Sequence, residues 1–123
     1  EFVLTKILRQ RGYDCTPYDP LYNLPLPTEQ GTYDIVVLCE VIEHLRQLRQ
    51  ELKLVKSLLN EGGFLYVRTQ FYGNVEEVKS WWYANDVTHI NFFNEASLLY
   101  VAKLLDGQLD EYDGKRKALI RVK

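Results

Sequence analysis

Two carboxylates and an imidazole lie close together in the sequence, at Glu40, Glu43 and His44. If a helix begins near Glu43, their side chains converge, because residues three and four apart share a helical face. Carboxylate oxygens and a neutral imidazole nitrogen form a reasonable ligand set for a divalent metal ion. Their spacing therefore predicts a polar site suited to metal binding or to proton transfer.

His89 is the other histidine of the chain. It lies in a predicted loop at the same end of the sheet as Glu40, so Glu40, Glu43, His44 and His89 form a candidate metal site. His89 is also a candidate general base or substrate contact, and a purely structural role stays open. Glu43 has an alternative as well, since a carboxylate stabilises the start of a helix. His44 can equally line a pocket without a metal.

A short apolar run, residues 35–38, directly precedes this polar group. An unalternating run with β-branched residues is typical of a strand buried on both faces of a parallel sheet, so we predict a strand at residues 34–39. In open α/β sheets, ligands bind beyond the carboxyl ends of the strands. Cys39 and Glu40 therefore stand where a ligand is expected.

The elements around this strand follow from periodicity and from turn residues. A helix with an apolar stripe is predicted after Glu40 and ends at Gly62 as a left-handed cap. The next strand is predicted at residues 64–69, parallel to the first, which makes a βαβ unit. A helix at residues 1–11, a strand at 13–19 and a loop at 20–32 are predicted upstream.

Residues 70–93 are irregular and rich in aromatic side chains, with a short helix predicted around residues 75–82. Tyr83 and Asp86 are expected to face a pocket and contact substrate, whereas Trp81 is expected to pack in the core. Asn94 predicts the start of a helix through Asp106, with Leu99 among its inward residues. A hairpin is predicted from strands at residues 109–112 and 116–122.

The pattern predicts one α/β domain over residues 1–123, with a mostly parallel sheet and a C-terminal antiparallel hairpin. The net charge of −2 gives no electrostatic footprint for nucleic acid, and no apolar run is long enough to span a membrane. Two cysteines in different predicted elements argue against a disulfide framework and indicate a cytoplasmic setting. The chain has no Met and opens on Glu1, so we expect a piece of a longer protein.

Three segments together resemble a known family: YDIVVLCEVIEHL, LLNEGGFLYVRT and WWYANDVTHINFF, at residues 33–45, 58–69 and 81–93. Their order and spacing resemble class I S-adenosylmethionine-dependent methyltransferases. The third segment is similar to small bacterial members with a WWY and D-x-TH pattern. The resemblance covers the whole chain. It implies a Rossmann-like fold whose first strand and Gly-rich loop are missing here, so that the domain is truncated at its N-terminus.

The resemblance implies S-adenosylmethionine as the cofactor. The predicted strands at 13–19, 34–39 and 64–69 correspond to the family's second, fourth and fifth strands. Asp19 then takes the position of the acidic residue that binds the ribose hydroxyls, although an Asp-Pro pair also opens turns. Cys39 or Glu40 would contact the cofactor.

The E-x-x-E-H pattern at residues 40–44 also resembles two groups of metal-using O-methyltransferases. One acts on catechol-like intermediates of ubiquinone synthesis, and the other on the 2′-hydroxyl of small RNAs, with a further His from a later loop. The resemblance thus implies a divalent metal. The resemblance also favours methylation on oxygen. Because the chain is not basic, we expect a small-molecule acceptor and no nucleic acid, and because it has no long apolar run we expect no membrane partner.

Two alternatives remain. A degenerate methyltransferase-like domain can serve as a non-catalytic binding or dimerisation module, and a homodimer stays open for either interpretation. A Gly-rich loop encoded directly upstream of Glu1 would favour the enzyme. A redox enzyme with a nucleotide cofactor is the other alternative, and the lack of a Gly-rich loop within the chain removes its main support.

Overall fold

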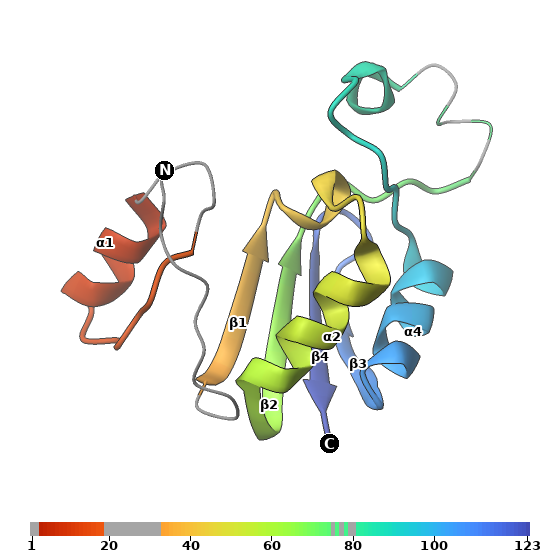
Figure 1. Cartoon of the computed structure of the whole chain (residues 1–123). Helices are drawn as coiled ribbons and strands as arrows, with labels where there is room; N and C mark the ends of the chain where they lie inside the picture. Colours follow the sequence, from red (N-terminus) through yellow and green to blue (C-terminus); the bar gives the residue numbers. More distant parts are fainter. Residues whose placement is uncertain (1–2, 19–32, 75, 77, 79–80) are drawn as a thin grey trace.

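The computed structural model describes residues 3–18, 33–74, 76, 78 and 81–123. Helices and strands alternate through its centre and a hairpin ends the chain (Figure 1). The elements in chain order are α1 (Val3–Gln10), β1 (Tyr33–Cys39), a 3₁₀ turn (Ile42–His44), α2 (Leu48–Leu58), β2 (Leu59–Arg68), a second 3₁₀ turn (Trp82–Asn85), α4 (Glu95–Leu104), β3 (Gly107–Tyr112) and β4 (Lys117–Val122).

The four described strands form one mixed sheet in the order β1-β2-β4-β3. β1 and β2 are parallel, with Ile35 opposite Phe64 and Cys39 opposite Arg68, so the predicted βαβ unit is confirmed. β4 is antiparallel to both β2 and β3, which confirms the hairpin. The prediction of a mostly parallel sheet is wrong for these strands, because the hairpin contributes two of the three pairings.

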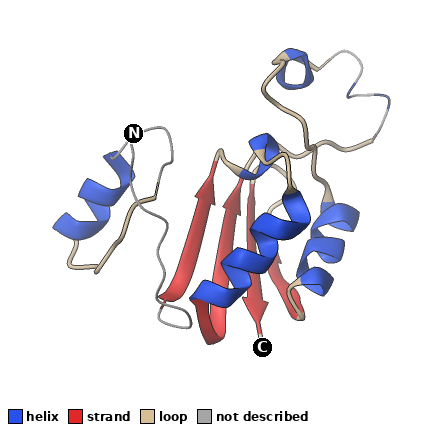
Figure 2. Ribbon diagram, viewed as in Figure 1, coloured by secondary structure: helices blue, strands red, loops and turns tan. Residues whose placement is uncertain are grey.

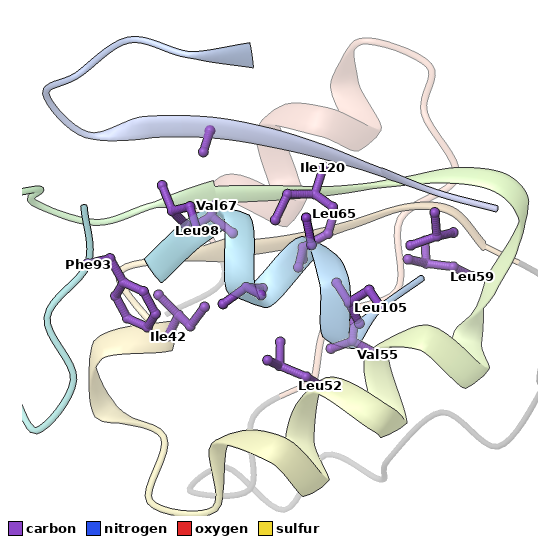
Figure 3. Close-up of a cluster of buried hydrophobic side chains, with 14 of the residues drawn as sticks. Ile42, Leu52, Val55, Leu59, Leu65, Val67, Phe93, Leu98, Leu105 and Ile120 are labelled. Carbon is purple, nitrogen blue, oxygen red and sulfur yellow. The ribbon is translucent and has the colours of Figure 1, made fainter. Parts of the chain in front are cut away.

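The core lies between the sheet and two helices that cover the same face of it (Figures 1 and 2). β2 alternates strictly near its end, burying Leu65 and Val67 toward the helices. Figure 3 shows these side chains interleaved with those of α2, α4 and β4, including Leu52, Leu98 and Ile120. Burying one such aliphatic side chain contributes about 1.5–3 kcal/mol, so this layer anchors the strands whose ends form the site described below.

The opposite face of the sheet carries no helix among the described residues, and β1 shows the consequence (Figure 2). Ile35 is 53% exposed and Val37 is 37% exposed. The prediction that this strand is buried on both faces is therefore wrong. Only the alternate residues Val36 and Leu38 pack against the core. α1 lies beyond the edge of β1, and no residue in its span Val3–Gln10 is buried.

The observed start of α2 and start of β2 differ from the predicted boundaries, and the sequence pattern does not show the contacts found there. α2 begins only at Leu48, after the separate 3₁₀ turn, and β2 already begins at Leu59. Gly62, with φ +74°, therefore lies inside β2 and does not cap the helix. The Asn60 amide donates a hydrogen bond to Asp34 Oδ1 at 2.7 Å, which joins β2 to β1 where their pairing is irregular.

Residues 13–18 form no strand, so the prediction of a strand at 13–19 is wrong over these residues. The segment turns back on the preceding helix: the Tyr13 N–H donates to the Leu8 carbonyl, and Arg9 Nε donates to the Cys15 carbonyl at 3.0 Å. These local bonds occupy backbone groups that a sheet would need. The predicted loop 20–32 lies outside the described residues, as do several positions of the predicted helix 75–82.

α4 begins as predicted, with Asn94 as its N-cap in a reciprocal capping box with Ser97. Leu99 was expected to face inward, but it is 53% exposed because α4 covers the sheet with its other side. The helix ends at Leu104, two residues before the predicted end at Asp106, and Asp106 takes the left-handed backbone conformation, at φ +51°. Across the part of the chain that the structure describes, no helix combines the length and apolarity needed to span a membrane.

Candidate active site

Glu40 occupies a strained backbone position at the carboxyl end of β1. Its φ is +56°, a left-handed conformation that costs a non-glycine residue about 1 kcal/mol. Its N–H still donates to the Arg68 carbonyl at 2.8 Å, so the strain begins where the pairing with β2 ends. Such strain persists only where surrounding contacts hold it, and it often marks functional sites. Here it brings the Glu40 carboxylate to 3.3 Å from the Tyr83 hydroxyl.

Glu43 is the buried acid of this corner, with 0% of its surface exposed. Its Oε2 accepts a hydrogen bond from the Tyr83 hydroxyl at 2.5 Å. Its Oε1 has no hydrogen-bond partner among the described residues. A buried polar atom without a partner is expensive for the fold and therefore calls for a physical explanation. A bound ligand is one such explanation.

The loop that carries His89 is held directly against this corner. The backbone carbonyl of Glu43 accepts from the N–H groups of Ile90, at 2.8 Å, and Asn91, at 3.1 Å. The Asn91 amide donates to the carbonyls of Ile42, at 3.1 Å, and Leu45, at 2.6 Å. These four bonds fix the loop against the 3₁₀ turn, so two segments more than forty residues apart form one site.

The two histidines point toward Glu43 with their tautomers defined. His44 Nδ1 is 2.9 Å from the Thr88 carbonyl, and His89 Nδ1 is 2.7 Å from the Tyr83 carbonyl. A carbonyl only accepts, so both Nδ1 atoms carry the hydrogen. When neutral, each ring then has a free lone pair on Nε2. Metal-binding histidines have this arrangement, with the other ring nitrogen donating to a carbonyl or carboxylate.

Glu43, His44 and His89 therefore offer three ligand atoms within 4.8 Å of one another. The His44 Nε2 lies 4.0 Å from Glu43 Oε2, and the two imidazole rings meet edge to face at 4.8 Å. One carboxylate and two imidazoles with open positions are a donor set that suits several divalent transition metals. The side chains present thus fit a metal ion, and the unpartnered Oε1 gives the fit a second, independent support.

Glu40 lies outside that group of three, although the sequence predicted it as a fourth ligand. Desolvation of its carboxyl, followed by the neighbouring Glu43 carboxylate, raises the pKa of Glu40. The two neighbouring carboxylates therefore repel each other, and a cation bound between them would relieve that repulsion. Its role as a ligand stays a prediction, and so does its role at the cofactor.

Tyr83 was expected to face a pocket, but it is 2% exposed and lies beneath the two acids. Besides its bonds to the carboxylates, its hydroxyl is 2.8 Å from Thr69 Oγ1. Burial, followed by the bond to Glu43, raises the pKa of Tyr83 well above its usual range. Thr69, at the end of β2, belongs to the site and was missed. Its position just after an apolar strand was the available signal.

Asp86 is exposed and its carboxylate closes a short turn. Oδ1 accepts from the Thr88 N–H at 2.9 Å and the Thr88 hydroxyl at 2.7 Å, which lowers the pKa of Asp86. Oδ2 lies 3.6 Å from His89 Nε2. Asp86 thus fixes the turn whose Thr88 carbonyl orients His44, and its contact with substrate stays a prediction.

The remaining predicted positions are less informative. Asp19 lies outside the described residues. Cys39 is an exposed free thiol at the end of β1, and Cys15 is also free. Trp81 is partly buried, with its ring 4.9 Å from that of Tyr83, as expected of a packing residue.

A parallel βαβ unit with a polar corner beyond its strand ends defines a Rossmann-like α/β domain. Comparison with protein families then gives a more specific result: residues 3–105 match the methyltransferase domain family. The chain therefore belongs to that family, which confirms the resemblance to class I S-adenosylmethionine-dependent methyltransferases. No curated protein matches the chain at a significant level.

Proposed function

We propose that this protein transfers a methyl group from S-adenosylmethionine to a hydroxyl of a small-molecule acceptor. Membership of the methyltransferase domain family supports methyl transfer in general. The observation that carries the proposal further is the buried Glu43 carboxylate, whose Oε1 lacks a partner within the described chain and which lies within 4.8 Å of a nitrogen of each imidazole. Such a corner binds and activates a polar group better than it stabilises a fold.

The reaction is an in-line displacement at the sulfonium methyl. The acceptor oxygen forms a bond to the methyl carbon while the carbon–sulfur bond breaks, and S-adenosylhomocysteine leaves as a neutral thioether. The acceptor hydroxyl must lose a proton. Where no cation occupies the site, Nε2 of His44 or of His89 is the group placed to take it. The rest of the catalytic effect lies in orientation and in the exclusion of water.

A divalent cation at Glu43, His44 and His89 forms the second part of the proposal, with Glu40 as a further ligand. When bound, such an ion lowers the pKa of an acceptor hydroxyl and orients it. The protein's own residues support this by their contacts: the Thr88 and Tyr83 carbonyls accept from Nδ1 of the two rings, which leaves Nε2 of each neutral ring able to bind a cation.

The cofactor is proposed to bind beside this corner. Cys39 and Glu40 stand at the carboxyl end of β1, the edge where open α/β sheets bind ligands. Asp19 is proposed to bind the ribose hydroxyls, on the strength of the family resemblance alone. Tyr83 is too buried to contact substrate in this conformation, whereas Asp86 is exposed and adjacent to His89.

The experiment measures S-adenosylhomocysteine released from S-adenosylmethionine by the intact protein, with a pool of small phenols and catechols as acceptors. We expect product formation that falls in His44→Ala and His89→Ala and that a chelator suppresses in the wild type only. Turnover that is unchanged in both variants, with and without the chelator, would remove the cation from the proposal. Turnover that is absent under every condition would count against methyl transfer to this acceptor class.

A non-catalytic module is the second candidate, and one observation favours it. β1 exposes Ile35 and Val37 on the sheet face that no described helix covers, and α1 exposes Val3, Leu4 and Ile7. Exposed apolar patches mark interaction surfaces. This alternative predicts a homodimer or a partner complex in sedimentation together with no affinity for S-adenosylmethionine.

A further inference from the structure

We infer that Tyr83 is a positioning residue that holds Glu43 in place to bind a divalent cation. The inference rests on the proposed cation site and adds a residue that donates no ligand atom to it. The contacts of Tyr83 place it at the base of the site and not in the wall of a substrate pocket.

The hydroxyl of Tyr83 has one proton and three oxygen neighbours. Glu43 Oε2 at 2.5 Å is the nearest acceptor, and Glu40 Oε1 at 3.3 Å is more distant. Since the proton goes to a carboxylate, Thr69 must donate its own hydroxyl proton to Tyr83 across their 2.8 Å contact. This order of donation polarises the Tyr83 hydroxyl and strengthens its bond to Glu43.

One carboxylate oxygen is thereby tied and the other is left available. Glu43 Oε2 is tied by Tyr83, whereas Oε1 has no partner in the residues that the structure describes. A fixed carboxylate with one free oxygen is ready to bind a cation without reorganising. The bond offsets part of the cost of burying Glu43 at 0% exposure, while Oε1 still lacks a partner in the described residues.

The same residue fixes the second ligand. The Tyr83 carbonyl accepts from His89 Nδ1 at 2.7 Å, and the Tyr83 ring lies 4.0 Å from the His89 ring. The Tyr83 side chain thus packs against the His89 ring and donates to Glu43, while the Tyr83 backbone carbonyl sets the tautomer of His89. Removing only the hydroxyl should loosen the carboxylate and leave the imidazole in place.

The test titrates Mn²⁺ alone into the intact protein and follows free Mn²⁺ by electron paramagnetic resonance. Tyr83→Phe is expected to weaken Mn²⁺ binding by about 10-fold, as removal of an outer partner of a metal ligand does. The matched control is Tyr100→Phe, which also loses one bonded hydroxyl, since Tyr100 accepts from Arg49 Nη2 on α2. Tyr100→Phe should bind Mn²⁺ as the wild type does.

Thr69→Val is a second variant that keeps Tyr83 intact and removes its donor. A loss of about threefold is expected for a hydrogen bond one step further from the ion. Circular dichroism establishes that each variant is folded, and if Tyr83→Phe is not folded, Thr69→Val decides. If the deciding variant binds Mn²⁺ as tightly as the wild type does, the positioning role of Tyr83 is overturned and the cation site itself is not. A wild type that binds no Mn²⁺ would overturn the cation site and this inference together.

Discussion

Two acidic corners lie at the same end of the sheet and use their carboxylates in opposite ways. One follows β1 and holds Glu43, and the other is the β3–β4 turn, which holds Asp113. Their shared location follows from the register, in which Arg68 lies opposite Cys39 on one side and Lys117 on the other. Asp113 Oδ1 accepts from three successive backbone N–H groups, at residues 115–117, at 2.8–3.0 Å.

The difference separates an acid whose presence its own turn explains from one that its local contacts do not fully explain. Asp113 is exposed, and its hydrogen bonds to the turn that carries it account for its presence. Glu43 is fully buried, is held by a tyrosine from a distant loop, and keeps one oxygen unpartnered as far as the described chain goes. Folding alone gives a reason for the first carboxylate and not for the second. The experiments below test that separation.

Replacing the buried acid should have the largest effect. We expect Glu43→Gln to lower turnover by about 100-fold, because the amide removes a charged ligand. The fold should survive, since the Gln carbonyl still accepts from Tyr83 and a neutral group costs less to bury. Steady-state kinetics and urea unfolding check both halves. Wild-type turnover in Glu43→Gln would make this acid as structural as Asp113.

Glu40→Gly should make the protein more stable and less active. Glycine adopts φ +56° without strain, so the free energy of unfolding should rise by about 1 kcal/mol. Chemical denaturation measures it. The matched control is Asp106→Gly, at φ +51°, which also loses the ion pair between Asp106 and Lys56 and should gain less. If Asp106→Gly stabilised the protein more than Glu40→Gly does, backbone strain at Glu40 would not account for the result.

Asp113→Ala should lower the free energy of unfolding by about 1 kcal/mol, because three hydrogen bonds close the turn but the site is exposed. Turnover and Mn²⁺ affinity should not change. Urea unfolding and the product assay, run on the same preparation, check the two expectations. An Asp113→Ala variant with intact stability and lost activity would reverse the assignment of the two corners.

A smaller effect is expected from pH. Although burial alone would raise it, the backbone N–H groups of residues 117, 115 and 116 lower the pKa of Asp113 to about 2. A folded pKa below the unfolded value of about 3.9 stabilises the protein above that value. The contribution should disappear as pH falls from about 4 toward 2. Comparing wild type with Asp113→Asn across that range by denaturation measures it, and parallel curves would contradict the expectation.

The parts of the fold that local pattern determines could be predicted from the sequence. Asn94 as an N-cap and the hairpin around Asp113 are each encoded within a few residues of where they form, and the parallel βαβ unit follows from the order strand, helix, strand along the chain. The grouping of Glu43, His44 and His89 also followed, because strand order sends their segments to one edge of the sheet.

The errors concern features that distant contacts decide. The exposed face of β1 depends on which side of the sheet the helices cover, and Gly62 depends on the Asn60–Asp34 bond between strands. The place of Tyr83 beneath the acids depends on a loop held by Ile90 and Asn91 N–H groups at the Glu43 carbonyl. No periodicity in the sequence encodes these contacts.

The most direct measurement of the central claim is isothermal titration of the intact protein with S-adenosylmethionine. A methyltransferase whose active site includes the corner after β1 should show saturable one-to-one binding. Asp113→Ala, altered only at the structural corner, should show the same affinity. An intact wild-type protein that releases no heat and shows no binding by equilibrium dialysis would contradict the enzymatic account and leave the non-catalytic module in its place.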